Sequence, residues 1–171
     1  ASHPIGTRVS WDAANQAYLE IELRRLRLLL QRRVLWLRRH WQHDPLHTYQ
    51  GLVISDVEAD WLLAGEDRQA EAHFYREDPE VAAIRQEIVE VERELAGQTR
   101  AMAEAGIRPA LDVLVHLFGL TPFERNVLLL CLAQEWDPTI GRLYAYVQDD
   151  VQHKYATPHL ALALFANLPS S

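Results

Sequence analysis

Apolar residues recur at helical spacing in two long stretches of the chain. The first stretch runs from about Trp11 to Trp41 and carries one continuous stripe, made of Leu19, Leu23, Leu26, Leu30, Val34, Leu37 and Trp41. The second begins with Asp78 as the capping residue and Pro79 at the first helical position, and it ends near Ala105. Its stripe, with steps of three and four residues, is Val81, Ile84, Ile88, Val91, Leu95, Gln98 and Met102. The pattern predicts two long helices.

Charge is divided unevenly along the chain, whose net charge is −7. Residues 1–49 carry eight arginines against four acidic residues, whereas residues 50–106 carry five arginines against fourteen acidic residues. The two segments either neutralise each other or attract outside partners, and we favour mutual pairing. We therefore expect the two long helices to pack side by side as an antiparallel hairpin, a stalk that occupies residues 1–106.

A shorter helix is expected between the two long ones. Ser55 is a capping residue, Glu58 completes a capping box with it, and Gly65 provides the stop. The next segment, residues 66–78, is acidic and aromatic, and its pattern leaves a further helical turn and a loop open.

After Gly106, residues that typically begin or end helices become frequent. Helix starts and stops follow one another at Pro109, Gly119, Thr121 with Pro122, Asp137 with Pro138, and Thr157 with Pro158. Thr121 and Glu124 are expected to form a capping box at the second of these starts. This spacing predicts short helices in a compact bundle over residues 107–171. Residues 148–156 are the one candidate for an extended, wing-like loop. The expected fold class is all-α, a long helical hairpin followed by a small helical bundle.

Composition excludes several classes of protein. Hydrophobic residues make up 49% of the chain, which is enough for a buried core. The longest apolar runs, Val127–Ala133 and Leu160–Ala166, are shorter than the roughly 20 residues of a membrane span, so we expect no membrane insertion. The first residues lack a signal-peptide pattern, and the lone Cys131 is expected to be buried among leucines. These features are typical of a cytoplasmic protein.

Phosphate-binding chemistry is not encoded in this stretch. A nucleotide-binding loop requires Gly-x-x-x-x-Gly-Lys-Ser/Thr, and the single lysine, Lys154, has no glycine at that spacing. We expect no ATP hydrolysis, no catalytic residue and no cofactor in this chain.

Four segments of the sequence resemble one family. They are Leu114–Pro138 (LVHLFGLTPFERNVLLLCLAQEWDP), Leu143–Asp150 (LYAYVQDD), Thr157–Leu164 (TPHLALAL) and, further upstream, Gly51–Leu63 (GLVISDVEADWLL). They are similar to the helical region that precedes the ATPase module of large bacterial AAA+ proteins, some of which accompany contractile injection systems. The resemblance implies a degenerate winged-helix-like bundle, and it implies that the chain is the N-terminal portion of a longer protein. It also implies a downstream AAA+ module that uses ATP and magnesium, and a protein client or adaptor as the partner.

The first long helix has a second apolar face, opposite the first stripe. Two interpretations stay open: the C-terminal bundle covers this face, or a partner or a second copy of the chain does. Arginines at seven-residue spacing lie within the face, and arginine with aromatic residues is typical of interface anchors. The candidate partner-binding residues are Ile21, Arg25, Leu28, Arg32, Leu35, Trp36 and Arg39.

The candidate metal-binding and nucleophilic residues are less well supported by the sequence. His40, His43 and His47 have spacings that suit a metal, but Pro45 should end the helix before the third histidine and no cysteine accompanies them. A nucleophilic pair of Cys131 and His116 is disfavoured by the apolar surroundings of the cysteine.

The corner from Leu120 to Leu130 also resembles the first helix of helix-turn-helix regulators. The helix that follows offers only Arg142 against three acidic residues over Asp137–Asp150, so nucleic acid is not the expected partner. The preferred function is a non-catalytic recognition region that docks a client or adaptor for remodelling by an AAA+ module. A stand-alone scaffold or homo-oligomer is the first alternative, and a DNA-binding regulator is the second.

Overall fold

The computed structural model describes residues 10–41, 55–65 and 67–165. Within these ranges the chain forms eight α-helices and no strand. The helices are α1 (Trp11–Trp41), α2 (Asp56–Ala64), α3 (Arg68–Glu77), α4 (Pro79–Glu104), α5 (Ala110–Phe118), α6 (Pro122–Trp136), α7 (Pro138–Val147) and α8 (Pro158–Phe165). The predicted all-α fold class is confirmed.

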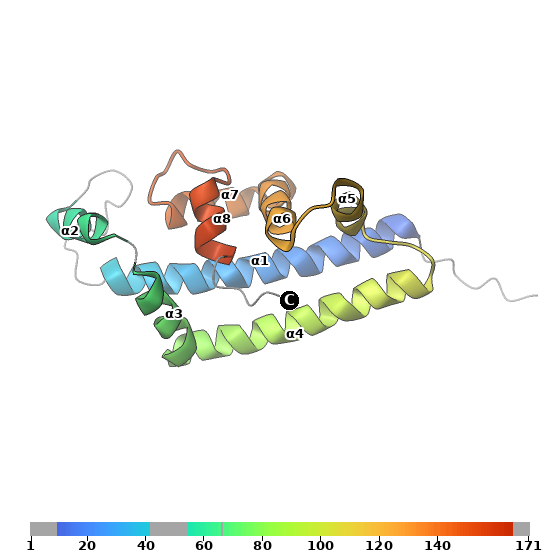
Figure 1. The fold of residues 1–171 in the computed structure, drawn as a ribbon, viewed down its shortest axis with the longest axis horizontal. Helices are drawn as coiled ribbons and strands as arrows, with labels where there is room; N and C mark the ends of the chain where they lie inside the picture. The colour runs from blue at the N-terminus through green and yellow to red at the C-terminus, as the bar shows by residue number, and fades with distance from the viewer. Residues whose placement is uncertain (1–9, 42–54, 66, 166–171) are drawn as a thin grey trace, which may run out of the picture.

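The two long helices, α1 and α4, lie side by side and run in opposite directions (Figure 1). The Asp78 carboxylate accepts hydrogen bonds from the amides of Glu80 and Val81, so α4 begins where the sequence predicts. The buried residues of α4 all belong to its predicted stripe: Val81, Ile84, Ile88 and Met102. The ion pair of Arg24 with Glu94, which joins the two helices, lies at the surface. Apolar burial therefore supplies most of the stabilisation of the hairpin.

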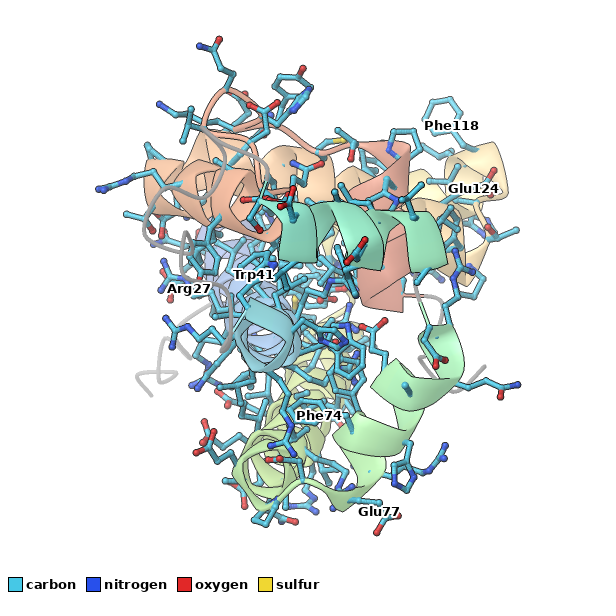
Figure 2. The ribbon with its side chains drawn as sticks, turned by 90° about the vertical axis from the view of Figure 1, so that its left-hand side faces the viewer. Arg27, Trp41, Phe74, Glu77, Phe118 and Glu124 are labelled. Atoms are coloured by element: carbon cyan, nitrogen blue, oxygen red, sulfur yellow. The ribbon has the colours of Figure 1, made fainter. Side chains whose placement is uncertain are left out.

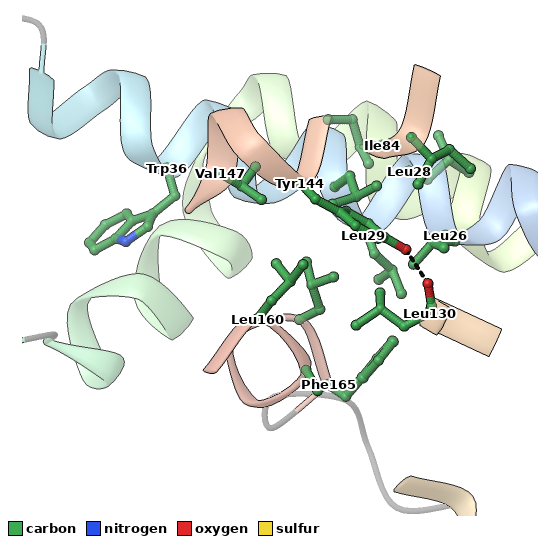
Figure 3. Close-up of a cluster of buried hydrophobic side chains, with 14 of the residues drawn as sticks. Leu26, Leu28, Leu29, Trp36, Ile84, Leu130, Tyr144, Val147, Leu160 and Phe165 are labelled. Atoms are coloured by element: carbon green, nitrogen blue, oxygen red, sulfur yellow. Dashed lines mark hydrogen bonds between the residues drawn. The ribbon is translucent and has the colours of Figure 1, made fainter. Parts of the chain in front are cut away.

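Helices α5 to α8 cover the side of α1 that faces away from α4, so that α1 runs through the middle of the molecule (Figure 1). One cluster of buried side chains joins Leu29 of α1 to Ile84 of α4 and to Tyr144 and Leu160 of the C-terminal helices. The Tyr144 hydroxyl donates a hydrogen bond of 2.7 Å to the Leu130 carbonyl within this cluster (Figure 3). Described helices of both predicted segments, 1–106 and 107–171, thus contribute side chains to one core cluster.

The corner between α5 and α6 is built by the predicted residues. Gly119 ends α5 with a φ of 61°, in the left-handed region that favours glycine. Thr121 then caps α6, and Glu124 accepts a hydrogen bond from the Thr121 amide in return. The expected capping box is confirmed, and it turns the chain sharply from one helix into the next.

The two segments that the sequence left open are ordered by specific contacts. Residues 68–77 form α3, whose buried side chains are Glu71 and Tyr75. Residues 148–156 form turns and bends rather than a strand, and the Gln148 side-chain amide donates to the backbone carbonyls of His153 (3.0 Å) and Tyr155 (3.1 Å). A Cβ on Gly141 would lie 2.8 Å from the Lys154 carbonyl oxygen, so the wing-like loop folds tightly onto α7.

None of the described helices combines the length and the apolar character that crossing a membrane requires.

Candidate functional site

The predicted partner-binding face of α1 is largely covered by the chain itself. Four of its residues are buried, Arg32 and Leu35 are half-buried, and Arg39 is exposed. The buried ones are Ile21, Arg25, Leu28 and Trp36. Leu28 and Trp36 belong to the same core cluster as Tyr144 and Leu160 of the C-terminal helices (Figure 3). This burial agrees with the first interpretation, in which the bundle packs on the second face, and it leaves these four side chains inaccessible to a partner.

Arg25 lies in a buried polar network around Glu22, whose side chain has no exposed surface. The Arg25 guanidinium contacts one Glu22 carboxylate oxygen at 3.1 Å, and Arg125 of α6 contacts the other. The Tyr18 hydroxyl accepts a hydrogen bond from Arg125 at 2.7 Å and donates one to the Asp112 carboxylate at 3.1 Å. Burial raises the pKa of Tyr18 well above its ordinary value, which keeps the hydroxyl protonated as a donor. The network joins α1 to α5 and α6.

Arg32 has an internal role as well. Its guanidinium stacks over the Tyr75 ring at 4.3 Å, and the Tyr75 hydroxyl donates a 2.5 Å hydrogen bond to Glu71. Glu71 also forms a buried ion pair with Arg33, with 3.0 Å between nitrogen and oxygen. Two of the arginines at seven-residue spacing therefore have internal roles: Arg25 belongs to the network that joins α6 to α1, and Arg32 packs on α3. The sequence offered one signal for this arrangement, the single acid Glu22 between Ile21 and Leu23 in an apolar stripe.

An exposed apolar surface lies at the corner between α5 and α6. Helix α5 buries only Leu111. Two pairs of its exposed side chains, Val113 with Leu117 and Leu114 with Phe118, are each four residues apart and therefore share one face of the helix. We call this surface the corner patch; it comprises Val113, Leu114, Leu117, Phe118 and Phe123, with exposed fractions of 38%, 37%, 69%, 72% and 40%. Figure 2 shows the Phe118 ring at the outer edge of the molecule, directed away from α1. Sequence analysis missed the corner patch, because periodicity marks an apolar face but not what covers it.

The corner patch has a negatively charged edge. Glu124 is exposed, and Figure 2 shows it at the same edge of the molecule as Phe118. The backbone hydrogen bond from Thr121 lowers the pKa of the Glu124 carboxyl below its ordinary value, so the group is ionised at neutral pH. A partner that fits this surface therefore presents apolar side chains next to a basic one.

A second exposed apolar feature is found on α2. None of its nine residues is buried, and its contact with α1 includes the Trp61 ring, 5.7 Å from the His40 ring. Near its C-terminal end, Leu62 and Leu63 are 53% and 85% exposed, and we call these two residues the leucine pair.

The structure describes only part of the candidate histidine cluster. His40 packs on the Trp36 ring at 4.0 Å, while His43 and His47 lie outside the described residues. Across the described part of the chain, no group of three or more histidine, cysteine or acidic side chains is placed to hold a metal ion. Cys131 is exposed, so the expectation that it is buried among leucines was wrong; the outward face of α6 carries it.

The surface formed by α7 and the wing-like loop carries both signs of charge. A hollow of about 300 Å³ lies between them, and its charged lining residues are Arg142, Asp149, Asp150 and Lys154. Phosphate binding favours a consistently basic surface, and two carboxylates here offset the two cations.

One family model matches residues 13–169, and its description is "Winged helix domain, variant". The match includes α1 to α4 as well as the C-terminal helices, so the long hairpin is part of the family's unit. No curated protein and no solved structure matches the chain. With nearly its whole length covered by that one model, the chain belongs to the variant winged helix domain family.

Proposed function

We propose that this chain is a non-catalytic recognition domain that docks an apolar segment of a protein partner on the corner patch. The observation that carries the proposal is the exposure of five clustered apolar side chains on α5 and the start of α6. Clustered exposed apolar residues with a polar edge are typical of protein-binding surfaces. The ionised Glu124 at that edge favours a partner segment that pairs aliphatic or aromatic anchors with a lysine or arginine.

The resemblance to regions that precede bacterial AAA+ modules supplies a setting for this activity. In that setting the chain holds a client or adaptor near a downstream module, and ATP and magnesium bind to that module rather than to this chain. A cytoplasmic location and, in some cases, a contractile injection system belong to the same proposal. Arg125 of α6 is bound to Glu22 of α1, and Asp112 of α5 to Tyr18 of α1, and these contacts would transmit force from the bound partner to the rest of the domain.

Selection of peptides from a phage-displayed library tests the docking surface directly. The chain serves as bait, and selected peptides are then synthesised and measured by fluorescence anisotropy. We expect peptides with apolar anchors and a basic flank, and at least tenfold weaker binding to the variant Leu117→Glu with Phe118→Glu. The matched control is Val89→Glu, because Val89 is 44% exposed on α4. Peptides that bind all three proteins equally would contradict the proposal.

DNA binding is the second candidate, because winged helix domains include DNA-binding members. The mixed charge around Arg142 and Lys154 argues against it. If the chain does read DNA, a duplex should bind at low salt and the affinity should fall when Arg142 and Lys154 are replaced by alanine. Absence of duplex binding at low salt removes this candidate.

A further inference from the structure

Helix α2 presents an exposed face to solvent. The helix contacts α1 through Trp61, whose ring lies 5.7 Å from the His40 ring. Trp61, Glu58 and Ala59 are the half-buried residues of α2, and its other residues are exposed. With 3.6 residues per turn, five of the exposed residues fall within about a third of the helix circumference. We call them the α2 face; they are Asp56, Val57, Asp60, Leu63 and Ala64.

The α2 face combines acidic and apolar side chains in a fixed order along the helix. Asp56 and Asp60 are one turn apart, and Leu63 follows one turn later. Val57 and Leu63 are 45% and 85% exposed. The helix carries three carboxylates and no basic side chain, so no cation of its own offsets the two aspartates. A surface that matches the α2 face is therefore basic where it meets the start of the helix and apolar about 10 Å further along.

We propose that the α2 face docks on a protein partner, in an apolar pocket edged by lysine or arginine. Leu63 and Val57 enter the pocket, and Asp56 and Asp60 pair with the basic edge, in the manner of an amphipathic helix bound in a groove. The acidic character of the helix disfavours nucleic acid. A second copy of this chain is disfavoured as well, since the apolar corner patch is edged by the ionised Glu124.

The α2 face and the corner patch are separate surfaces near opposite ends of α1 (Figure 1). Helix α2 contacts α1 at His40, whereas the start of α5 is held at Asn15, whose side-chain oxygen accepts a 2.8 Å hydrogen bond from the Ala110 amide. At about 1.5 Å per helical residue, Asn15 and His40 are roughly 38 Å apart along the axis. A partner bound at α2 therefore leaves the corner patch open, and this inference goes beyond the proposed function.

Selection with a bait whose corner patch is disabled tests the α2 face. The bait is the full chain with Leu117→Glu and Phe118→Glu. The library is a phage-displayed three-helix scaffold, randomised along the groove between two of its helices. We expect the selected scaffolds to carry lysine or arginine beside apolar residues. Their affinities for variants of the bait are then measured by fluorescence anisotropy.

Two variants separate the apolar and the charged parts of the contact. Val57→Ser with Leu63→Ser should weaken binding at least tenfold, whereas Leu62→Ser, 53% exposed on the same helix but outside the α2 face, should change it less than threefold.

Asp56→Asn with Asp60→Asn should weaken binding about threefold to tenfold, and less at high salt. The cap of α2 is untouched by this change, because Ser55 supplies it. The charge control is Glu87→Gln with Glu90→Gln, an exposed pair on α4 that should leave the affinity unchanged. Circular dichroism checks that every variant keeps its helicity.

Three outcomes would overturn the inference. The first is a set of scaffolds that bind the Val57→Ser, Leu63→Ser variant as well as the bait. The second is selection of scaffolds with acidic or uncharged edges. The third is self-association of the unaltered chain over about 10 µM to 1 mM in sedimentation that Leu63→Ser abolishes, because a second copy would then be the occupant. Failure of the peptide selection on the corner patch would leave this inference standing, and failure here would leave the proposed function standing.

Discussion

The two sides of α1 are covered in different ways. On the α4 side an apolar seam is buried, and the Arg24–Glu94 ion pair lies at the surface, with each side chain about half exposed. On the other side, toward α5 and α6, the charged groups themselves are buried: Glu22 is inaccessible and is held between Arg25 and Arg125. Apolar seams tolerate loss of a single contact better than buried charges tolerate loss of a partner. The C-terminal side should therefore be the more specific and the more fragile.

Glu22→Ala is the substitution that should separate the two sides most clearly. It leaves the Arg25 and Arg125 guanidinium groups in the interior without their shared carboxylate, and loss of one member of a buried ion pair costs about 3–5 kcal/mol. Urea unfolding monitored by circular dichroism measures the loss. A triple variant, Glu22→Leu with Arg25→Met and Arg125→Met, should recover most of the stability, since no buried charge then remains unpaired. A loss below 1 kcal/mol for Glu22→Ala would show that the network is hydrated.

Ile84→Ala probes the apolar seam on the α4 side. Ile84 is buried in the core cluster between α4 and α1, and truncation of a buried isoleucine costs about 2–4 kcal/mol through lost contacts and a cavity. The same urea titration gives the value, and Ala83→Ser on the exposed side of α4 is the control. Two results together would contradict the distinction between the two sides. They are a loss of unfolding free energy for Ile84→Ala as large as that for Glu22→Ala, and an equal loss for Ile84→Leu, which restores the side-chain volume.

Asp137→Asn tests a surface ion pair on the C-terminal side as a function of pH. Hydrogen bonds from Thr139 lower the pKa of the Asp137 carboxyl below its ordinary value of 3.8, and Arg27 lowers it further. A depressed pKa in the folded state stabilises the fold above the ordinary pKa, and this contribution is lost as the pH falls through the folded-state value. The unaltered chain should therefore exceed Asp137→Asn in stability from neutral pH down to about pH 4, and the difference should shrink below it. A difference that is the same at pH 7 and pH 2.5 would refute the ionic contribution.

The features that the sequence predicted correctly depend on residues that are close together in the chain. The bounds of α1 and α4, the Asp78 cap and the Thr121 capping box follow from periodicity and from side chains within four residues of each other. The sequence did not predict the burial of Glu22, because the compensating Arg125 is 103 residues away. The sequence also pointed to α1 as the candidate partner-binding surface, and the structure buries Ile21, Arg25, Leu28 and Trp36 of that face. The periodicity of α5 shows an apolar face, but whether α1 covers that face is decided by the sharp turn at Gly119 and by the contacts of Tyr18 with Asp112.

Arg24→Ala should have the smallest effect of these substitutions, and the smallness is itself informative. The pair with Glu94 crosses from α1 to α4, where opposite charge on the two helices first suggested that they pack together. Both side chains are about half exposed, and such pairs contribute at most about 0.5 kcal/mol because water and salt screen them. A double-mutant cycle with Glu94→Ala at low and high salt measures the coupling between the two residues. A coupling above 1 kcal/mol that persists at 1 M salt would mean that the hairpin depends on charge as well as on apolar burial. A coupling near zero would mean that the uneven distribution of charge influences which helices pair but contributes little to the stability of the hairpin.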